Sequence, residues 1–319
     1  MIPILISALA AIIPATLYAM FFYWMDRYEH EPGWLLRLTF LWGAIPAIFI
    51  SIVGEVLLSY PLSDTVRSIQ GDLYEAALVA PVVEETAKAL ALLWVYKRHA
   101  REFDGPLDGL IYGAMIGFGF SMTEDFAYFV SAYEEGGYAE QGFTIFARAV
   151  LFGLSHAFFT GITGISFGFA RIHRNRSARR LYPVLGLALS ITFHMLHNFG
   201  AVLASVNTAA IFVTLWVATV GVLSTIVIVV WFWKREQKVI HAYLEPEIGT
   251  LITEAEYQKL RHGWRKPAAF CRGDEKNLAF RLQTCMQFAL RKNRFEHGEA
   301  DLVDDVAELH QSLKDSYLA

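Results

Sequence analysis

The chain has 319 residues, 55% of them hydrophobic, and a mean hydropathy of +0.37. Soluble globular domains are only about 45–50% apolar, so this composition excludes an ordinary water-soluble fold and points to the lipid bilayer as the solvent. The formal net charge is −4 and the basic residues lie beside apolar segments, so the sequence gives no sign of binding nucleic acid.

Hydrophobic runs of membrane-spanning length follow one another from the start of the chain to Trp233. A helix needs about 20 mainly apolar residues to cross the hydrocarbon core, which predicts about seven spans, near 2–25, 34–59, 73–96, 107–131, 144–170, 181–204 and 209–233. The predicted fold is all-α: a polytopic transmembrane helix bundle over 1–235 and a small helical cytoplasmic appendage over 236–319. The first run is expected to be a span, because it lacks the charged start and the small-residue cleavage site of a secretory leader.

Lys and Arg concentrate in alternate connections between the predicted spans. Loops on the cytoplasmic side carry the positive excess, so this pattern predicts a multi-pass protein of the cell membrane with its N-terminus outside and its C-terminus in the cytoplasm. The residues that set this orientation are Arg27, Arg37, Lys97, Arg98, Arg101, Arg171, Arg174, Arg176, Arg179, Arg180, Lys234, Arg235 and Lys238.

Beyond the last span the composition becomes charged and mixed. The spacing of apolar residues predicts helices near 253–260, 277–292 and 301–313, the first opened by Thr253 with Glu256 three residues later, as in a capping box. Both cysteines, Cys271 and Cys285, fall in this segment and are expected to be reduced in the cytoplasm. No chemistry is predicted for this appendage.

The third span carries Glu84, Glu85 and Lys88 near its middle. A charged side chain at the centre of a span costs about 2.5–3.5 kcal/mol on insertion scales, so each of these residues needs an interior partner or a function. Glu84 and Lys88 are four residues apart and share a helix face. Glu85 points about 100° away, so Lys88 is expected to hold one carboxylate while the other faces a different group.

The next three spans each add ionisable or strongly polar groups. Glu84, Glu85, His156 and His194 all lie about 17–21 Å from the predicted span boundaries at 1.5 Å per residue, with Glu124 nearer the outer face. We expect these groups to meet in one site. Taken singly, each has a structural explanation: a histidine can bond to a neighbouring helix, an ion pair can satisfy itself, and glycines can serve close packing. The groups are Phe120 and Glu124 in the fourth span, His156 and Thr160 in the fifth, and His194, His197 and Asn198 in the sixth.

This combination of groups suits amide hydrolysis. A carboxylate can act as the general base that activates a water, while histidines and Asn198 polarise the carbonyl and stabilise the oxyanion. His156, His194 and Glu85 could equally bind zinc, since imidazole and carboxylate are normal zinc ligands. No helical HExxH pair is present, so zinc would need ligands from separate spans, and the spacing does not choose between the two mechanisms.

These residues also carry a family resemblance. Glu84 to Lys88 is similar to the EExxK motif of the PrsW family of bacterial intramembrane proteases, distant relatives of the CAAX prenyl endopeptidases. The resemblance continues through Asp108 to Gly113, Phe120 to Glu124, Arg148 to His156 with Thr160, and His194 to Asn198. Prenyl endopeptidases have histidine where this chain has Glu124, so the sequence sides with PrsW and gives no support for prenylated substrates.

The resemblance implies an endopeptidase that cuts a single-span membrane protein within the lipid bilayer, the known case being an anti-sigma factor in a stress response. It implies catalytic roles for Glu84, Glu85, Glu124, His156 and His194. Supporting roles would fall to Lys88, Asp108, Phe120, Arg148, Thr160 and Asn198. No cofactor is firmly implied, although zinc is possible from the residue types.

Two other classes of function use similar residues. A proton- or ion-coupled transporter also places carboxylates and histidines inside the membrane, but it often has repeated halves, and no repeat is apparent in this sequence. A non-catalytic scaffold could bind single-span helices through faces rich in small residues. Solute-dependent flux would favour the transporter, and substrate binding without any product would favour the scaffold.

Overall fold

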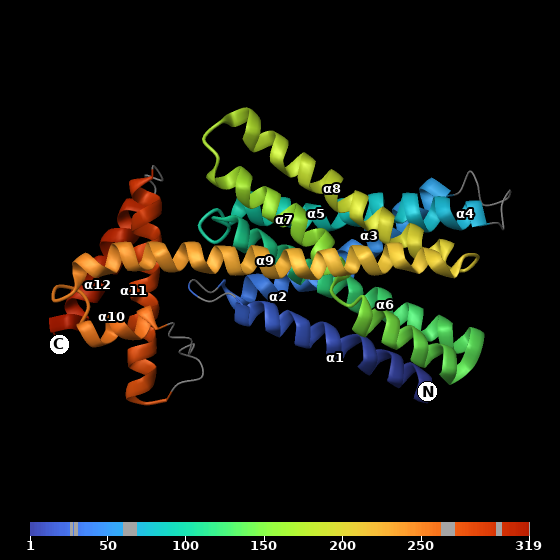
Figure 1. The fold of residues 1–319 in the computed structure, drawn as a ribbon, viewed down its shortest axis with the longest axis horizontal. Coiled ribbons are helices and arrows are strands. Elements are labelled where there is room, and N and C mark those ends of the chain that lie inside the picture. Colours follow the sequence, from blue (N-terminus) through green and yellow to red (C-terminus); the bar gives the residue numbers. More distant parts are fainter. Residues whose placement is uncertain (26–27, 29–30, 60–68, 263–271, 298–301, 319) are drawn as a thin grey trace. The chain divides into compact units, whose positions relative to one another are not determined.

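The computed structural model describes residues 1–25, 28, 31–59, 69–262, 272–297 and 302–318 (Figure 1). These residues form helices and one isolated β-bridge between Ile248 and Ile252, and no strand occurs among them, which confirms the all-α prediction. The chain divides into two compact units. Unit 1 comprises Met1–Met25 and Glu31–Val227, and unit 2 comprises Asp26–His30 and Ile228–Ala319.

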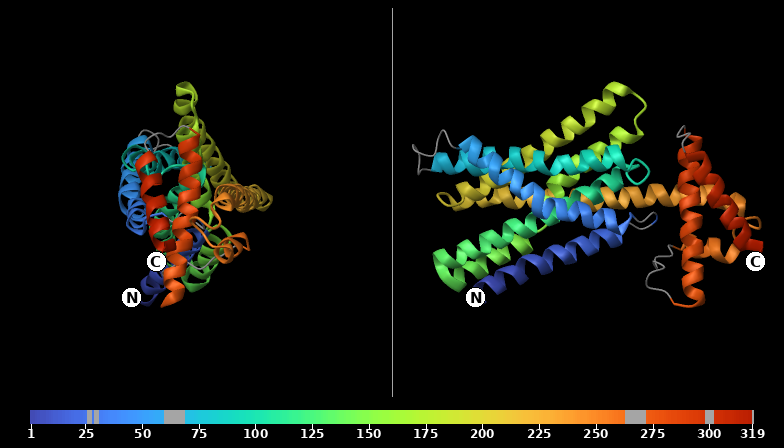
Figure 2. Two further views of the ribbon diagram at one scale, coloured as in Figure 1. Left: turned by 90° about the vertical axis from the view of Figure 1, so that its left-hand side faces the viewer. Right: turned by 180° about the vertical axis from the view of Figure 1, so that it is seen from behind.

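Unit 1 is a bundle of long helices that run alongside one another (Figures 1 and 2). Short π-helical turns interrupt the helices at three places, and each turn lies beside a segment that carries polar residues. Such turns are common near functional sites because they change the direction of the side chains that follow. In chain order the elements are α1 (Ile2–Met25), α2 (Gly33–Trp42), η1 (Gly43–Ala47), α3 (Ile48–Ser59), α4 (Ile69–Tyr74), η2 (Glu75–Val79), α5 (Ala80–Arg98), α6 (Pro106–Ile145), η3 (Phe146–Leu151), α7 (Ser155–Ile172), α8 (Arg176–Leu203) and the first part of α9 (Ile211–Leu244).

Five helical stretches among the described residues are long and apolar enough to cross a membrane: Ile2–Met25, Gly33–Ser59, Pro106–Ile172, Arg176–Leu203 and Thr208–Glu247. The polytopic prediction is therefore confirmed, although the number differs from about seven, for two reasons. One is that α5 carries too many charged residues to count as an apolar stretch. The other is that the stretch Pro106–Ile172 contains two of the predicted spans.

Those two predicted spans form a helical hairpin. The chain reverses at Gly137, whose φ of 68° belongs to the left-handed region that glycine adopts readily. Beyond it the Tyr138 ring lies 5.0 Å from the Tyr133 ring, and the Gln141 amide donates to the Phe129 carbonyl at 3.5 Å, so the arms run antiparallel. Residues 132–143, expected to be a connection between spans, are thus helical on both sides of Gly137.

Glycines let α6 approach its neighbours closely. A Cβ atom on Gly164 of α7 would lie 1.8 Å from the Gly109 carbonyl oxygen, and one on Gly117 would lie 2.5 Å from the His156 carbonyl oxygen. Small residues allow such backbone contacts between membrane helices, where packing rather than the hydrophobic effect holds helices together. The expected close-packing role of these glycines is confirmed, and one consequence is that the start of α7 is held firmly against α6.

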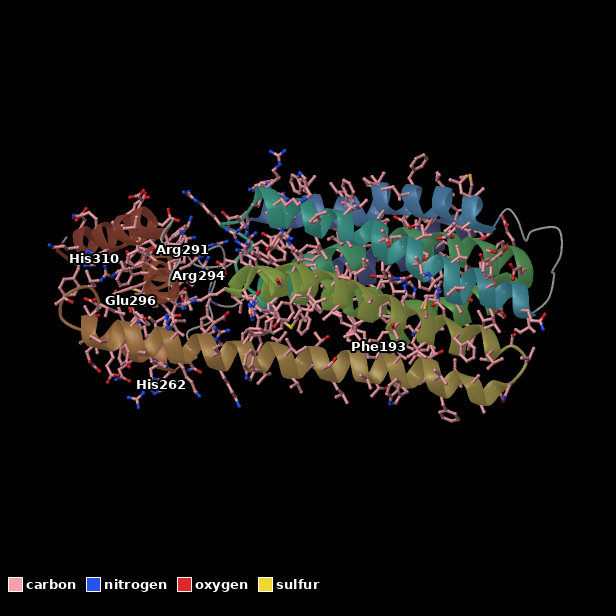
Figure 3. All side chains as sticks on the ribbon, turned by 90° about the horizontal axis from the view of Figure 1, so that it is seen from above. Phe193, His262, Arg291, Arg294, Glu296 and His310 are labelled. Carbon is pink, nitrogen blue, oxygen red and sulfur yellow. The ribbon has the colours of Figure 1, made fainter. Side chains whose placement is uncertain are left out.

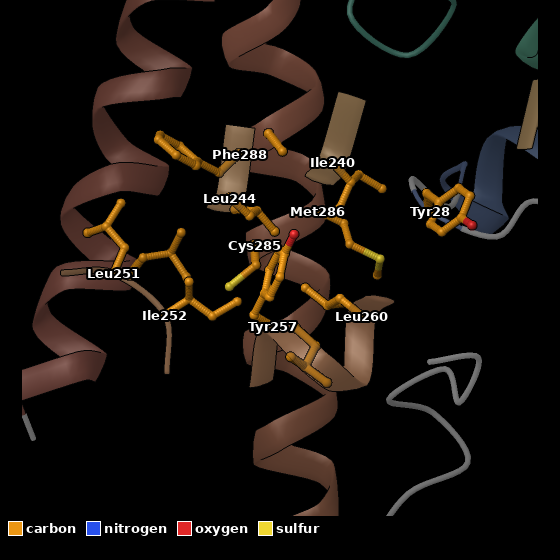
Figure 4. Close-up of a cluster of buried hydrophobic side chains, with 13 residues drawn as sticks. Tyr28, Ile240, Leu244, Leu251, Ile252, Tyr257, Leu260, Cys285, Met286 and Phe288 are labelled. Atoms are coloured by element: carbon orange, nitrogen blue, oxygen red, sulfur yellow. The ribbon is translucent and has the colours of Figure 1, made fainter. Parts of the chain in front are cut away.

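Unit 2 has a hydrophobic core made by the end of α9 with α10 (Glu254–Arg261), α11 (Asp274–Glu296) and α12 (Val303–Leu318) (Figure 4). The three helices predicted after the last span are confirmed, including the capping box of Thr253 and Glu256. Arg281 joins the parts by donating to Glu256 Oε1 at 2.6 Å and to the Leu251 carbonyl at 2.7 Å. Glu296, labelled in Figure 3, accepts a hydrogen bond from the Tyr243 hydroxyl at 2.7 Å.

Candidate active site

The two glutamates and the lysine of α5 form one buried ion cluster. Lys88 Nζ lies 3.1 Å from Glu84 Oε2 and 2.8 Å from Glu85 Oε1, and it stands 3.7 Å from the centre of the Phe120 ring on α6. The predicted pairing of Glu84 with Lys88 is confirmed. The expectation that Lys88 holds only one carboxylate is wrong, because positions three and four residues back both lie within reach of a lysine side chain on the same helix.

Every oxygen of Glu85 is engaged. Oε1 faces Lys88 Nζ and also His194 Nδ1 of α8 at 3.2 Å, while Oε2 accepts hydrogen bonds from Thr160 Oγ1 of α7 at 3.2 Å and from Ser190 Oγ of α8 at 2.9 Å. A carboxylate accepts but does not donate, so His194 Nδ1 must carry the proton. This leaves His194 Nε2 with a lone pair, 4.0 Å from Glu84 Oε2.

His156 lies near the start of α7 and joins the cluster to α6. Its Nδ1 is 3.1 Å from Lys88 Nζ, and its Nε2 is 2.8 Å from Glu124 Oε2. An ammonium group has no acceptor, so Nδ1 accepts from Lys88, and Nε2 carries the proton that it donates to Glu124. The two imidazole rings, of His156 and His194, have their centres 5.1 Å apart.

Arg148 in η3 pairs with two acidic residues of α6 that adjoin the cluster. It donates from Nη2 to Glu124 Oε2 and from Nε to Asp125 Oδ1, both at 2.6 Å. Asp125 also accepts a hydrogen bond from Ser121 Oγ at 3.0 Å. Paired charge-assisted bonds of this kind orient a carboxylate strongly, so Arg148 fixes the Glu124 oxygen that His156 contacts.

Two residues with predicted supporting roles lie outside the cluster. Asp108 is at the first turn of α6, about 24 Å from Glu124 along the helix, and its Oδ2 accepts from the backbone nitrogens of Asp104 and Gly105 at 2.8 and 2.6 Å. There it caps the helix. Asn198 lies one turn beyond His194 and donates to the Ala76 carbonyl of η2 at 2.7 Å, which joins α8 to the start of α5.

Sequence reasoning did not single out Ser190 or assign a role to Asp125. Ser190 is four residues before His194 on α8, so helical spacing alone places both on one face toward Glu85. Serine is frequent in membrane helices and carries no charge that would draw attention to it. Asp125 follows Glu124 directly, and only the fold shows that both carboxylates turn toward Arg148.

The donor groups fit a metal ion. One ligand atom each from Glu84, Glu85, His156 and His194 can be chosen so that all lie within 4.8 Å of one another. Two imidazoles and two carboxylates are a donor set that zinc accepts. The Lys88 ammonium lies against Glu84, Glu85 and His156, which shows that these donors are arranged around positive charge.

Comparisons with known proteins match the region that contains this site. A family model described as "PrsW family intramembrane metalloprotease" matches residues 31–232. The protease PrsW of Geobacillus kaustophilus is 31% identical over 195 residues, covering 60% of this chain and 77% of the relative. The protease PrsW of Oceanobacillus iheyensis is 30% identical over 190 residues and that of Bacillus subtilis 28% over 193, each covering 60% of this chain and 80% of the relative.

No solved structure gives a significant match. The family model spans α2 to α8, which supply every side chain of the site, and continues into α9. Together with the shared sequence of the relatives, this extent shows that the chain belongs to the PrsW family of intramembrane metalloproteases.

Proposed function

We propose that the chain hydrolyses a peptide bond of a single-span membrane protein, such as an anti-sigma factor, at the cluster of Glu84, Glu85, His156 and His194. The observation that carries this proposal is that donor atoms from three different helices come within 4.8 Å of one another inside an apolar bundle. Ionisable groups are costly in this environment and mark functional sites by default. Membership in a protease family agrees with hydrolysis.

Glu84 is the residue best suited to act as the general base. Within the described part of the chain its Oε1 has no hydrogen-bond partner, and its side chain is 6% exposed, whereas the Glu85 side chain is fully buried and bonded through both oxygens. A base must reach a water molecule, so the freer carboxylate takes the proton. Glu85 then acts by fixing His194 and Lys88.

The histidines and Lys88 supply the positive and hydrogen-bonding groups around the scissile bond. Lys88 is held by Glu84, Glu85 and His156 Nδ1, and the proton on His156 Nε2 is held by Glu124. Groups fixed in this way stabilise developing negative charge without reorganising. Glu84 through Oε2 and His194 through Nε2, with Glu85 and His156 beside them, would hold the metal implied by the family, which leaves Glu84 Oε1 for the water. When bound, a divalent ion supplies Lewis-acid polarisation of the carbonyl and activation of water.

The same proposal places the protein in the cell membrane with its N-terminus outside and its C-terminal unit in the cytoplasm. The positive bias of alternate connections supports this orientation. A reporter enzyme fused after Ala319 tests it, since the fusion is active only if that end lies in the cytoplasm.

Cleavage by the purified protein in proteoliposomes tests the function. With a single-span substrate, Glu84→Gln is expected to lower kcat by about 10²–10⁴-fold because it removes the base. It is expected to cost less stability than Glu85→Gln, because Lys88 keeps its ion pair with Glu85. Glu85→Gln is expected to lower both kcat and stability. Glu75→Gln, on the exposed side of η2, is the matched control and should cleave normally. Full activity of Glu84→Gln would contradict the assignment.

Metal content gives a second, independent measurement. The purified protein is expected to contain a divalent transition metal, and His194→Ala is expected to lose it, because it removes one ligand of the set. Retention of the metal by His194→Ala would show that the ion binds elsewhere.

A further inference from the structure

One face of α3 is turned toward the site and carries polar groups that the proposed mechanism does not use. Ala47, just before α3, is fully buried against Ala87 of α5 and Phe120 of α6, the ring on which Lys88 stands. Ser51 and Glu55 follow at intervals of four residues, so they continue this face toward the end of α3.

α3 lies close against α5 at this level. A Cβ atom on Gly54 would lie 2.5 Å from Val83 Cγ1. Glu55 follows Gly54 on α3 and Glu84 follows Val83 on α5, so the two glutamates belong to neighbouring turns of the two helices. Glu55 is near enough to interact electrostatically with both Glu84 and Glu124. It therefore stands at the edge of the catalytic cluster.

Ser51 and Glu55 lack partners that the rest of the site has. Ser51 is 3% exposed, and its hydroxyl has no hydrogen-bond partner within the part of the chain that the structure describes. Glu55 likewise makes no hydrogen bond or ion pair with any described residue. A buried hydroxyl without a partner costs about 1–3 kcal/mol, and a carboxylate in a membrane helix costs more, so a ligand that bonded both would recover that energy.

The charges of the site determine which ligand fits. Lys88 forms its ion pairs with the two glutamates of α5, and Arg148 forms its ion pairs with Glu124 and Asp125. Lys88 therefore acts on Glu55 only over a longer distance, without a direct ion pair. The side chains of Glu124 and Arg148 are 20% and 26% exposed, whereas Lys88 is fully buried. Glu55 thus lies on the more open side of the site, and no cation among the described residues forms an ion pair with its carboxylate.

We propose that Glu55 and Ser51 form a substrate-binding subsite that takes a lysine or arginine side chain close to the scissile peptide bond. The carboxylate pairs with the cation and the Ser51 hydroxyl accepts a hydrogen bond from it. The proposal rests on the proteolytic function proposed above and adds substrate selection to it. Lys and Arg side chains near a span end extend their charged groups toward the interface, so a substrate can present one near this end of α3.

Cleavage of a substrate series measures the selection. Lysine, or glutamine as its neutral counterpart, is placed singly at each position near the cut, and kcat/KM is compared within each pair. At one position the unmutated protein is expected to prefer lysine by about tenfold, the range of a charge-assisted hydrogen bond away from bulk water. Glu55→Gln is expected to bring that ratio near one, and Glu55→Lys to reverse the preference toward the glutamine substrate.

Glu134→Gln is the matched control, because Glu134 is an exposed glutamate beside the reversal at Gly137, and this variant should keep the tenfold ratio. A ratio near one at every position in the unmutated protein, or a preference that Glu55→Gln leaves intact, would overturn the proposal.

Cross-linking measures binding of the substrate lysine at Glu55 independently of cleavage. A carbodiimide joins an amine to a carboxylate only when the two are in contact, so mass spectrometry should find the substrate lysine linked to Glu55. If the link forms but no substrate is cut, the subsite stands and the proteolytic function fails. If cleavage occurs and no link to Glu55 forms, the function stands and the subsite is wrong.

Discussion

Lys88 shows how a single buried ammonium group is stabilised within the site. Its ammonium contacts Glu84, Glu85 and His156 and lies over the Phe120 ring, so the energy of burying it is recovered through several interactions at once. Removing one member of a buried ion cluster costs more than the cluster contributes as a whole, because the remaining charges stay buried without a partner.

Substitution of Lys88 by methionine therefore has a predicted cost. Lys88→Met is expected to lower the free energy of unfolding by about 3–5 kcal/mol, because Glu84 and Glu85 lose their cation. Added zinc is expected to raise the melting temperature of this variant more than that of the unmutated protein, since the ion can replace the lost charge. Thermal unfolding in detergent measures both effects, with the exposed Lys97→Met as the control. Equal stability of the two variants would contradict the prediction.

Arg148 offers a test of positioning without loss of charge. Arg148→Lys keeps one positive charge but cannot make the two parallel bonds to Glu124 and Asp125. Because the Glu124 oxygen that Arg148 contacts also meets His156, cleavage is expected to fall by roughly tenfold in kcat with KM little changed. Cleavage kinetics check this, and a change confined to KM would show that Arg148 binds substrate instead.

At the scale of elements, the close contact of α6 with α7 determines where His156 lies. Gly164→Ala is expected to force the helices apart, because its Cβ would lie 1.8 Å from the Gly109 carbonyl oxygen. Loss of stability by about 1–3 kcal/mol and loss of activity should follow together. Gly142→Ala is the matched control in the same hairpin, since nothing lies within 4 Å of its Cβ position. Melting temperatures and cleavage rates separate the two variants.

The helices also show which features of the site and the fold could be predicted from the sequence. Charged residues in apolar helices are rare enough that Glu84, Glu85, His156 and His194 could be grouped from their depth alone, and the structure brings them together. The hairpin at Gly137 could not be predicted, because a helix that reverses at one glycine has the same polar composition as a loop. Ser190 and Glu55 were missed for another reason: their importance depends on which helices adjoin, and this is a property of packing.

On the scale of the whole molecule, unit 2 has its own core and can be followed separately through Cys285. This thiol is fully buried in α11, and burial raises its pKa to about 12. The protonated thiol is thus retained in the folded unit, while the unfolded chain releases the proton near the ordinary thiol pKa of 9.0. Stability from this group is present below pH 9 and is lost as pH rises toward 12.

Thiol labelling checks that expectation. In a Cys271→Ser variant, Cys285 is the one remaining cysteine of the chain, and a maleimide should react with it at pH 8 only as unit 2 unfolds. The labelling rate should rise steeply with urea. Rapid labelling without denaturant would show that the core around Cys285 opens readily.

The pairing within α5 has a consequence for how the protein is made. Glu84 and Glu85 both pair with Lys88, which lies one turn further along the same helix, so the two carboxylates and their counter-ion enter the membrane in one segment. α5 leaves the ribosome before α6, α7 and α8, which supply the other side chains that contact Glu85 and Lys88. The nascent segment can therefore pass from the insertion machinery into lipid with only one uncompensated charge among these three residues, and the histidines can join later.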